Sequence, residues 1–354
     1  MNWLLVFVPV SIGLHYVRPD LATAIFLTSA LAIVPLAGWL GTATEHLAEH
    51  TGEGIGGLLN ATFGNAAELI IAIAALRKGL YSVVKASLTG SIIGNVLLVM
   101  GAAVLAGGLK YKEQQFNQTG ARTQTTMLTL AAIALIIPAA FHHIAGARGA
   151  SFEDDLSLEI SIVLLITYAA SLLFTLQTHK YLFTGELPQT ADVQTAPSWT
   201  TTKSLAVLAG ATAAIAWISE ILVGSVEQAA HSLGMSSVFV GVIVVAIVGN
   251  AAEHSTAVIV ARKNRMDLSL GIALGSSLQI ALFVAPLLVL ISYLAGPRSM
   301  DLVFTPAEVL AVTLSVLIAG QITADGKSNW MEGVQLLAVY VILAIAFFFL
   351  PDTH

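Results

Sequence analysis

The sequence contains no cysteine, and only 10% of its 354 residues are charged. The absence of cysteine excludes disulfide bonds, thiolate metal sites and redox chemistry at sulfur. Ordinary soluble domains have about 25% charged residues, so the low charge content argues against a soluble globular protein. The net charge of −6 is not concentrated in a run of like charge, which argues against a nucleic-acid partner. The 56% of residues that are hydrophobic instead predict an all-α integral membrane protein.

Apolar runs of spanning length are separated by short polar boundaries. They lie near 21–41, 55–76, 86–109, 126–145, 156–176, 203–224, 235–261, 268–295, 302–322 and 330–350. Residues 1–17 are apolar but lack the basic start and cleavage site of a signal peptide, so we expect an extra N-terminal membrane helix there. This gives 11 transmembrane helices. The longest polar connection, 177–202, predicts a flexible linker.

A short motif that places a carboxylate inside an apolar run occurs twice. Residues 64–68 read Gly-Asn-Ala-Ala-Glu, and residues 249–253 repeat them 185 positions later. The register continues beyond the motif, because Gly90-Ser91 falls on Gly275-Ser276 at the same offset. The chain therefore predicts two five-helix repeats, 21–176 and 203–350, beside the extra helix.

The basic residues predict how the helices are oriented, since cytoplasmic loops are enriched in Lys and Arg. With a cytoplasmic N-terminus and an external C-terminus, nine basic residues lie inside and six lie outside. The nine are Lys110, Lys112, Arg122, Lys180, Lys203, Arg262, Lys263, Arg265 and Lys327. The two motif helices then run in opposite directions, so the repeats are inverted and the linker is cytoplasmic. Inverted repeats around a midplane site are typical of secondary transporters.

Glu68 and Glu253 are the candidate ligands and proton carriers of that site. An ionised carboxylate inside a membrane is expensive and is most often functional. Asn65 and Asn250 share a helix face with these glutamates, and Gly64 and Gly249 would loosen the backbone just before them. The flexible oxygen shell suits Ca²⁺. When the cation leaves, two adjacent carboxylates in a poorly solvated site should take up protons, which makes Ca²⁺ and H⁺ competitors.

Further polar residues occupy corresponding places in the two repeats. Ser91 aligns with Ser276, whereas Asn95 and Gln279 differ by one residue in the aligned register. They either line the site or form ordinary interhelical hydrogen bonds. His254 follows Glu253 and could carry a further proton. Glu45 and Glu227, one helix earlier in each repeat, either attract cations into vestibules at opposite faces or are solvated helix ends.

One motif suggests an unrelated function. Residues 46–50 match the H-x-x-E-H pattern, in which His46 and His50 would bind zinc as in a membrane metallopeptidase. This remote alternative leaves the repeated motif unexplained, and we do not expect an enzyme.

Four segments closely resemble the cation/proton exchanger (CAX) branch of the calcium/cation antiporter superfamily: 57–71, 90–95, 249–254 and 275–280. The resemblance implies 11 helices, Ca²⁺/H⁺ antiport without a cofactor, and Glu68 and Glu253 as the glutamates that bind ions and carry protons. It also places Asn65, Asn250, His254, Asn95, Ser276 and Gln279 at positions that line the site.

The expected partners are the lipid bilayer, Ca²⁺ and protons. The sequence does not decide whether the protein forms a homo-oligomer. The compact form suggests the cell membrane rather than a vacuole. A Na⁺/Ca²⁺-type exchanger is the close alternative, although the core helices show no additional acidic or hydroxyl-rich sodium sites.

Overall fold

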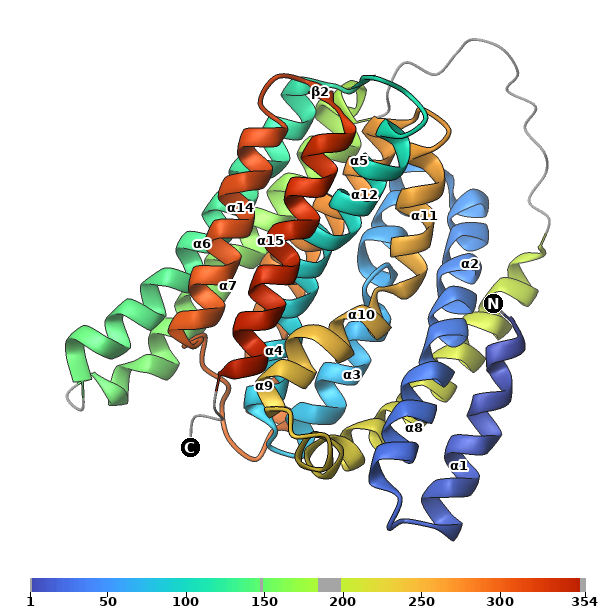
Figure 1. The fold of residues 1–354 in the computed structure, drawn as a ribbon, viewed down its shortest axis with the longest axis vertical. Coiled ribbons are helices and arrows are strands. Elements are labelled where there is room, and N and C mark those ends of the chain that lie inside the picture. The colour runs from blue at the N-terminus through green and yellow to red at the C-terminus, as the bar shows by residue number, and fades with distance from the viewer. Residues whose placement is uncertain (1, 147–148, 184–198, 351–354) are drawn as a thin grey trace.

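The computed structural model describes residues 2–146, 149–183 and 199–350, and their fold is almost entirely helical (Figure 1). The elements up to the linker are η1 (Asn2–Val6), α1 (Phe7–Val17), α2 (Ala22–Phe63), α3 (Ala66–Arg77), α4 (Tyr81–Ile93), η2 (Gly94–Val99), α5 (Met100–Gly108), β1 (Gln114–Gln115), α6 (Gln118–Ala145), η4 (Ala150–Phe152), α7 (Glu153–Leu173), η5 (Phe174–Thr178) and η6 (Lys180–Leu182). After it come α8 (Thr201–Ser232), α9 (Ser237–Phe239), η7 (Val240–Val245), α10 (Ala246–Gly249), α11 (Ala251–Ala261), α12 (Met266–Gln279), η8 (Ile280–Val284), α13 (Ala285–Ala295), α14 (Pro306–Ile322), β2 (Lys327–Ser328) and α15 (Trp330–Phe349). Most of the predicted linker 177–202 lies outside the described residues.

The described part of the chain contains seven helices long and apolar enough to cross a membrane, or eight with one bent pair. The seven are Ala22–Thr51, Tyr81–Gly108, Gln118–Ala145, Glu153–Thr178, Thr201–Ser232, Met266–Ala295 and Trp330–Phe349. Two shorter apolar helices are Asn2–Val17 and Pro306–Ile322. The predicted multi-pass membrane class is confirmed, whereas the count of eleven crossings stays a prediction.

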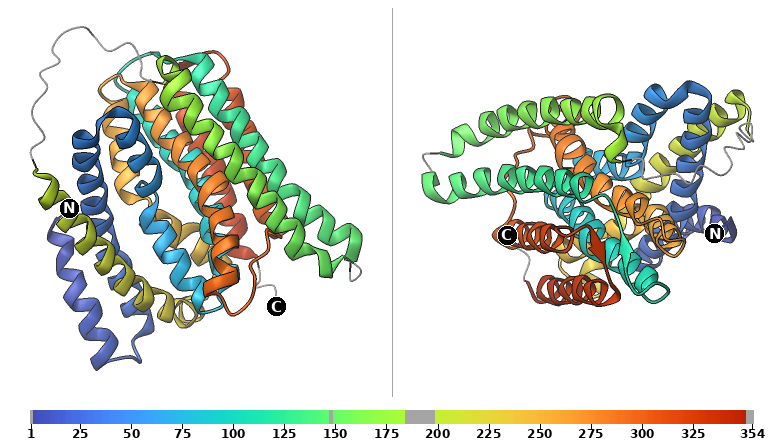
Figure 2. Two further views of the ribbon diagram at one scale, coloured as in Figure 1. Left: turned by 180° about the vertical axis from the view of Figure 1, so that it is seen from behind. Right: turned by 90° about the horizontal axis from the view of Figure 1, so that it is seen from above.

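The predicted runs 21–41 and 55–76 are not separated by a loop. The helical segment α2 continues from the first run into the second and bends sharply between them. The carbonyl oxygen of Ala48 lies 2.7 Å from the position that a Cβ atom on Gly56 would occupy. Eight residues of a straight helix would place them about 12 Å apart, so the chain folds back near Thr51. The blue ribbon in Figure 2 shows the second arm returning towards α3. A glycine at position 56 is required here because any side chain would strike the first arm.

The helices that carry the two motifs are interrupted at the motifs themselves. Gly64 and Asn65 form a turn between α2 and α3, and Asn250 forms the corresponding turn between α10 and α11. At the second motif the helical segments Val240–Gly249 and Glu253–Ala261 meet at a bend of 66°. The first break includes Gly64, whereas Gly249 is the last residue of α10 and the second break follows it at Asn250. Irregular backbone at membrane depth is tolerated where it lines a cavity.

Each helix that pairs with a broken helix contains π-helical turns. η2 follows α4 and includes Asn95, and η8 follows α12 directly after Gln279. Such turns inside α-helices are frequently found at functional sites. A wider turn also changes which residues face a given direction, which fits the one-residue difference in register between Asn95 and Gln279.

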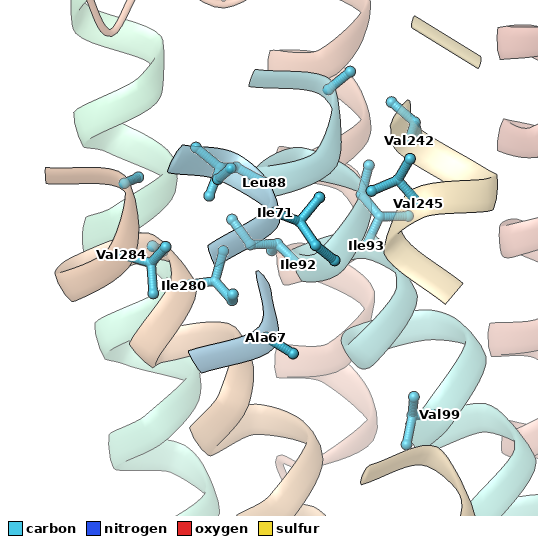
Figure 3. Packing of buried hydrophobic residues seen from close by; sticks show 14 of the residues in the cluster. Ala67, Ile71, Leu88, Ile92, Ile93, Val99, Val242, Val245, Ile280 and Val284 are labelled. Atoms are coloured by element: carbon cyan, nitrogen blue, oxygen red, sulfur yellow. The ribbon is translucent and has the colours of Figure 1, made fainter. Parts of the chain in front are cut away.

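Glycines allow close packing in the apolar core. Gly333 of α15 lies against α5, where an added Cβ would be 2.8 Å from the carbonyl oxygen of Gly101. Buried hydrophobic side chains fill the space between α3, α4, η7 and η8, among them Ile71, Ile92, Val242 and Ile280 (Figure 3). In lipid, where helix association depends on close packing, these contacts hold the helices together.

The molecule has two distinct ends. The antiparallel pair of β1 and β2 marks one end, which we call the β face (Figure 1). There the backbone nitrogen of Asn117 donates to Asp267 Oδ1 over 2.6 Å. At the opposite face Lys85 forms an ion pair of 2.6 Å with Asp301.

Candidate functional site

Glu68 and Glu253 each lie in the first turn of the helix that follows a motif break, α3 and α11 respectively. One oxygen of each carboxylate, Oε2, is buried and has no hydrogen-bond partner. The two carboxylates are near enough to interact electrostatically. Two unsatisfied, like-charged carboxylates in a membrane interior are costly. A cation between them, or protons on them, would remove that cost.

A glycine of one repeat lets the glutamate of the other come close. A Cβ atom on Gly249 would lie 3.1 Å from Glu68 Oε1 and 3.2 Å from its Cγ. Glu68 of the first repeat therefore lies against the motif backbone of the second. The glycine of the motif thus serves for close approach as well as for the helix break.

Asn65 belongs to the first repeat and is bound by side chains of the second. Its amide nitrogen donates to Gln279 Oε1 over 2.5 Å, and its Oδ1 accepts from the Ser276 hydroxyl over 2.9 Å. Asn65 is buried, so the amide is held in one orientation beside the acidic pair.

Asn250 belongs to the second repeat and is bound by side chains of the first. Its Nδ2 donates to the Ser91 hydroxyl over 2.9 Å, and its Oδ1 accepts from Asn95 over 3.3 Å. The structure thus brings together the predicted polar residues of both repeats as two matching sets of hydrogen bonds. Since both asparagine oxygens accept from protein groups, the two amides join the repeats at the site.

We expect Ser276→Ala to weaken cation binding at the site more than Ser277→Ala does. The variant leaves the buried Asn65 oxygen without its donor, a loss of about 1–3 kcal/mol. The affinity of the site for a cation should therefore fall by about tenfold in a binding assay. Ser277→Ala is the matched control, because the Ser277 hydroxyl bonds only Ala273 O of its own helix. Equal cation affinity of both variants would contradict the assigned role of these hydrogen bonds.

A cavity of about 500 Å³ leads from Glu253 towards the β face. Its lining includes Glu45, Asn60, Glu253, Ser276 and Gln279, together with Gly64 and Gly249. A second cavity of about 330 Å³ shares Asn60 and Gln279 and also reaches Asn117 and Asp267. Water and ions can therefore approach Glu253 from the β face.

The comparison with known proteins gives the family. Residues 21–177 and 203–349 match the family described as sodium/calcium exchanger protein. The chain belongs to this family. It is also 50% identical to a Ca²⁺/H⁺ antiporter of Aphanothece halophytica, over 98% of this chain and 96% of that protein. The Ca²⁺/H⁺ antiporter ChaA of Bacillus subtilis is 47% identical over 93% of both chains. The solved structure of native YfkE is 44% identical, covers 98% of both chains and superposes with a TM-score of 0.83. The family consists of transporters, so the chain is not an enzyme.

In this exchanger family member, the remaining predicted residues lie at different distances from the acidic pair. His254 is half-buried, and its Nε2 is buried without a hydrogen-bond partner. Glu45 lines the large cavity, as a vestibule residue would. Glu227 is exposed near the end of α8, away from that cavity.

The H-x-x-E-H pattern does not form a zinc site in the described part of the exchanger. His46 Nδ1 pairs with Glu49 at 3.0 Å, and its ring stacks on Trp199. His50 Nε2 instead contacts the carbonyl oxygen of Trp199 at 2.8 Å. Among the described residues, no three His, Asp or Glu side chains are grouped to hold a metal. The metallopeptidase alternative is wrong.

Two residues of the exchanger were missed by the sequence argument. Asn60 lines both cavities one turn before the first motif, and its polarity within an apolar run was a usable signal. Glu308 is 2% exposed, and its Oε1 accepts from the Thr89 hydroxyl over 3.1 Å. The T-x-x-E capping box that Thr305 begins could have located Glu308 at the start of α14.

Proposed function

We propose that this protein is a secondary antiporter that exports Ca²⁺ from the cytoplasm in exchange for protons by alternating access. The observation that carries the proposal is a pair of glutamates from two repeated motifs, Glu68 and Glu253, each with a buried Oε2 atom that has no hydrogen-bond partner. The names of the relatives that are about half identical over nearly the whole chain agree with it.

The chemistry of the pair explains why the two ions exclude each other. Two carboxylates supply up to four oxygens and two negative charges, which suits a flexible oxygen shell for Ca²⁺. Backbone carbonyls at the breaks, Asn65, Asn250 and water would complete that shell. Without the cation, burial and mutual repulsion favour protonation. His254 would tune this competition or carry a further proton, so either metal or protons occupy the site.

We further propose that the β face is cytoplasmic. If the β face is cytoplasmic, the nine basic residues that the sequence predicts to lie inside are cytoplasmic, as the positive-inside rule expects. They include Lys110, Arg262 and Lys327. The structure then represents a state in which the site is open to the cytoplasm through the cavity at Glu45 and Glu253.

The proposed topology has eleven crossings in the cell membrane. The helix 1–17 lies outside two inverted repeats, 21–176 and 203–350, which the cytoplasmic linker 177–202 joins. The N-terminus is cytoplasmic and the C-terminus external. The seven long helices, the bent pair, the two shorter apolar helices and the broken pair at Gly64 supply these crossings.

A transport assay in sealed vesicles tests the function. With the purified protein in proteoliposomes, an imposed pH gradient should drive Ca²⁺ accumulation in the absence of sodium, and a protonophore should abolish it. Strict dependence on a sodium gradient would indicate a Na⁺/Ca²⁺-type exchanger instead. Ca²⁺ flux that continues unchanged after the proton gradient is collapsed would indicate a channel. Both outcomes contradict the proposal.

A further inference from the structure

The two repeats meet along a closed contact on the side of the site away from the β face. Gly90 of α4 lies against η7, where an added Cβ would be 2.5 Å from the Cα of Val242. A Cβ on Gly241 would likewise lie 2.6 Å from the Cβ of Ala86. These backbones approach too closely for any side chain, so the contact closes the site towards the opposite face. The buried side chains around Val242 in Figure 3 continue this closed region.

The offset of 185 residues between the repeats identifies the counterparts of this closed contact. The register holds through Gly56 and Gly241 on one helix and through Gly90 and Gly275 on the other. The counterparts of Ala86, Gly90, Gly241 and Val242 are, in that order, Gly271, Gly275, Gly56 and Gly57. All four counterpart positions are therefore glycine, whereas the closed contact has two.

The counterpart helices are separated in the structure. A Cβ atom on Gly271 or on Gly275 would meet no atom within 4 Å. Both residues line both cavities, to which the second arm of α2 contributes Asn60. Gly57 faces Leu176 of the segment after α7 rather than α12. Glycine in the middle of a helix weakens it relative to alanine, yet no contact in this state requires glycine at 271 or 275.

We propose that Gly56, Gly57, Gly271 and Gly275 form a closing seam that brings α12 against the second arm of α2 when the site opens to the opposite face. This inference rests on the proposed alternating access, because in an inverted repeat the second state exchanges the arrangements of the two halves. Gly275 then takes the place beside Gly57 that Gly90 now has beside Val242. The movement removes the large cavity, so Glu253 loses access to the β face.

Gly275→Val tests the seam by transport. The added side chain enters open space in the present state, so we expect normal expression and an unchanged melting temperature. It would prevent closure, and exchange should fall by at least about tenfold because the second state becomes poorly populated. Gly320→Val is the matched control, because Gly320 is also inside a membrane helix with nothing within 4 Å. Equal exchange by both variants would overturn the proposal.

A cross-link tests the same seam without relying on which ions are exchanged. The sequence has no cysteine, so Gly57→Cys with Gly271→Cys introduces the only two thiols. These positions are the counterparts of Val242 and Ala86, which both carry side chains in the closed contact. In membranes under mild oxidation we expect an intramolecular disulfide that forms as the protein visits the closed state. The disulfide should abolish transport, and reduction should restore it. Each single variant should remain active.

The two tests separate the seam from the proposed function. If the unsubstituted protein fails to exchange Ca²⁺ for protons but the double variant still cross-links, the proposed ion pair is wrong and the seam stands. If the unsubstituted protein exchanges these ions and the double variant never cross-links, or remains active when cross-linked, the seam is wrong.

Discussion

Glu68→Gln and Glu253→Gln should each abolish Ca²⁺/H⁺ exchange while leaving a folded protein. Glutamine keeps the size of the side chain and its capacity for hydrogen bonds, but it removes a charge and a titrating group. Removing one partner from a buried charged set typically costs about 3 kcal/mol or more, which corresponds to a loss of about a hundredfold or more in transport at limiting Ca²⁺. Proton-driven uptake into vesicles and the melting temperature, measured together, check both parts of this expectation.

The control for the glutamate variants is Glu113→Gln on the β face. Glu113 pairs with Lys327 at 3.0 Å, and both side chains are about half exposed. Exposed ion pairs contribute little, so exchange should remain near normal. Exchange at the normal rate in either site variant would contradict the assignment of the acidic pair, and a loss in all three variants would point to damage unrelated to the site.

Gly333→Leu should have the largest effect on folding. The position that its Cβ would occupy lies 2.8 Å from the carbonyl oxygen of Gly101 and 2.8 Å from the Cα of Leu105, and backbone atoms cannot give way as side chains can. The substitution would force α15 away from α5. Overpacking of this kind costs about 1–3 kcal/mol or more, so the melting temperature and the monodisperse yield in detergent should both fall clearly.

Gly210→Leu is the control for this packing variant. Gly210 is exposed on α8, and nothing lies within 4 Å of its Cβ position. The same added side chain should therefore face lipid and leave stability nearly unchanged. Equal stability of the two variants would show that the glycine contact between α5 and α15 is not required.

The membrane class and the acidic pair followed from the sequence because each depends on composition or on a local pattern. Low charge content and long apolar runs predict membrane helices whatever their packing. A carboxylate within such a run is costly and is most often functional, and its repetition in register predicted Glu253 as the partner of Glu68. The glycine of each motif predicted a weakened helix nearby, and the structure has its breaks at Gly64–Asn65 and at Asn250.

Contacts between distant segments could not be predicted in the same way. The fold-back of α2 depends on the fit of Gly56 against Ala48, although the helix itself continues through this region. Asn65 and Asn250 are predicted metal ligands from the sequence, and the structure adds that their amides pair with Ser276 and Ser91 across the repeats. His50 matched a zinc motif, yet its side chain contacts the backbone of Trp199, which is 149 residues away.

The sequence by itself determined that the protein crosses a membrane, and it predicted that two related halves contribute one acidic site. Only the tertiary structure decided which side of that site is open. Gly90 and Gly275 are equivalent in the sequence repeat, yet one is packed against Val242 and the other lines a cavity. Equivalent residues of the two repeats have similar sequence surroundings. In any one state of an alternating-access transporter, however, one side of the site is closed and the other is open, so equivalent residues have different contacts.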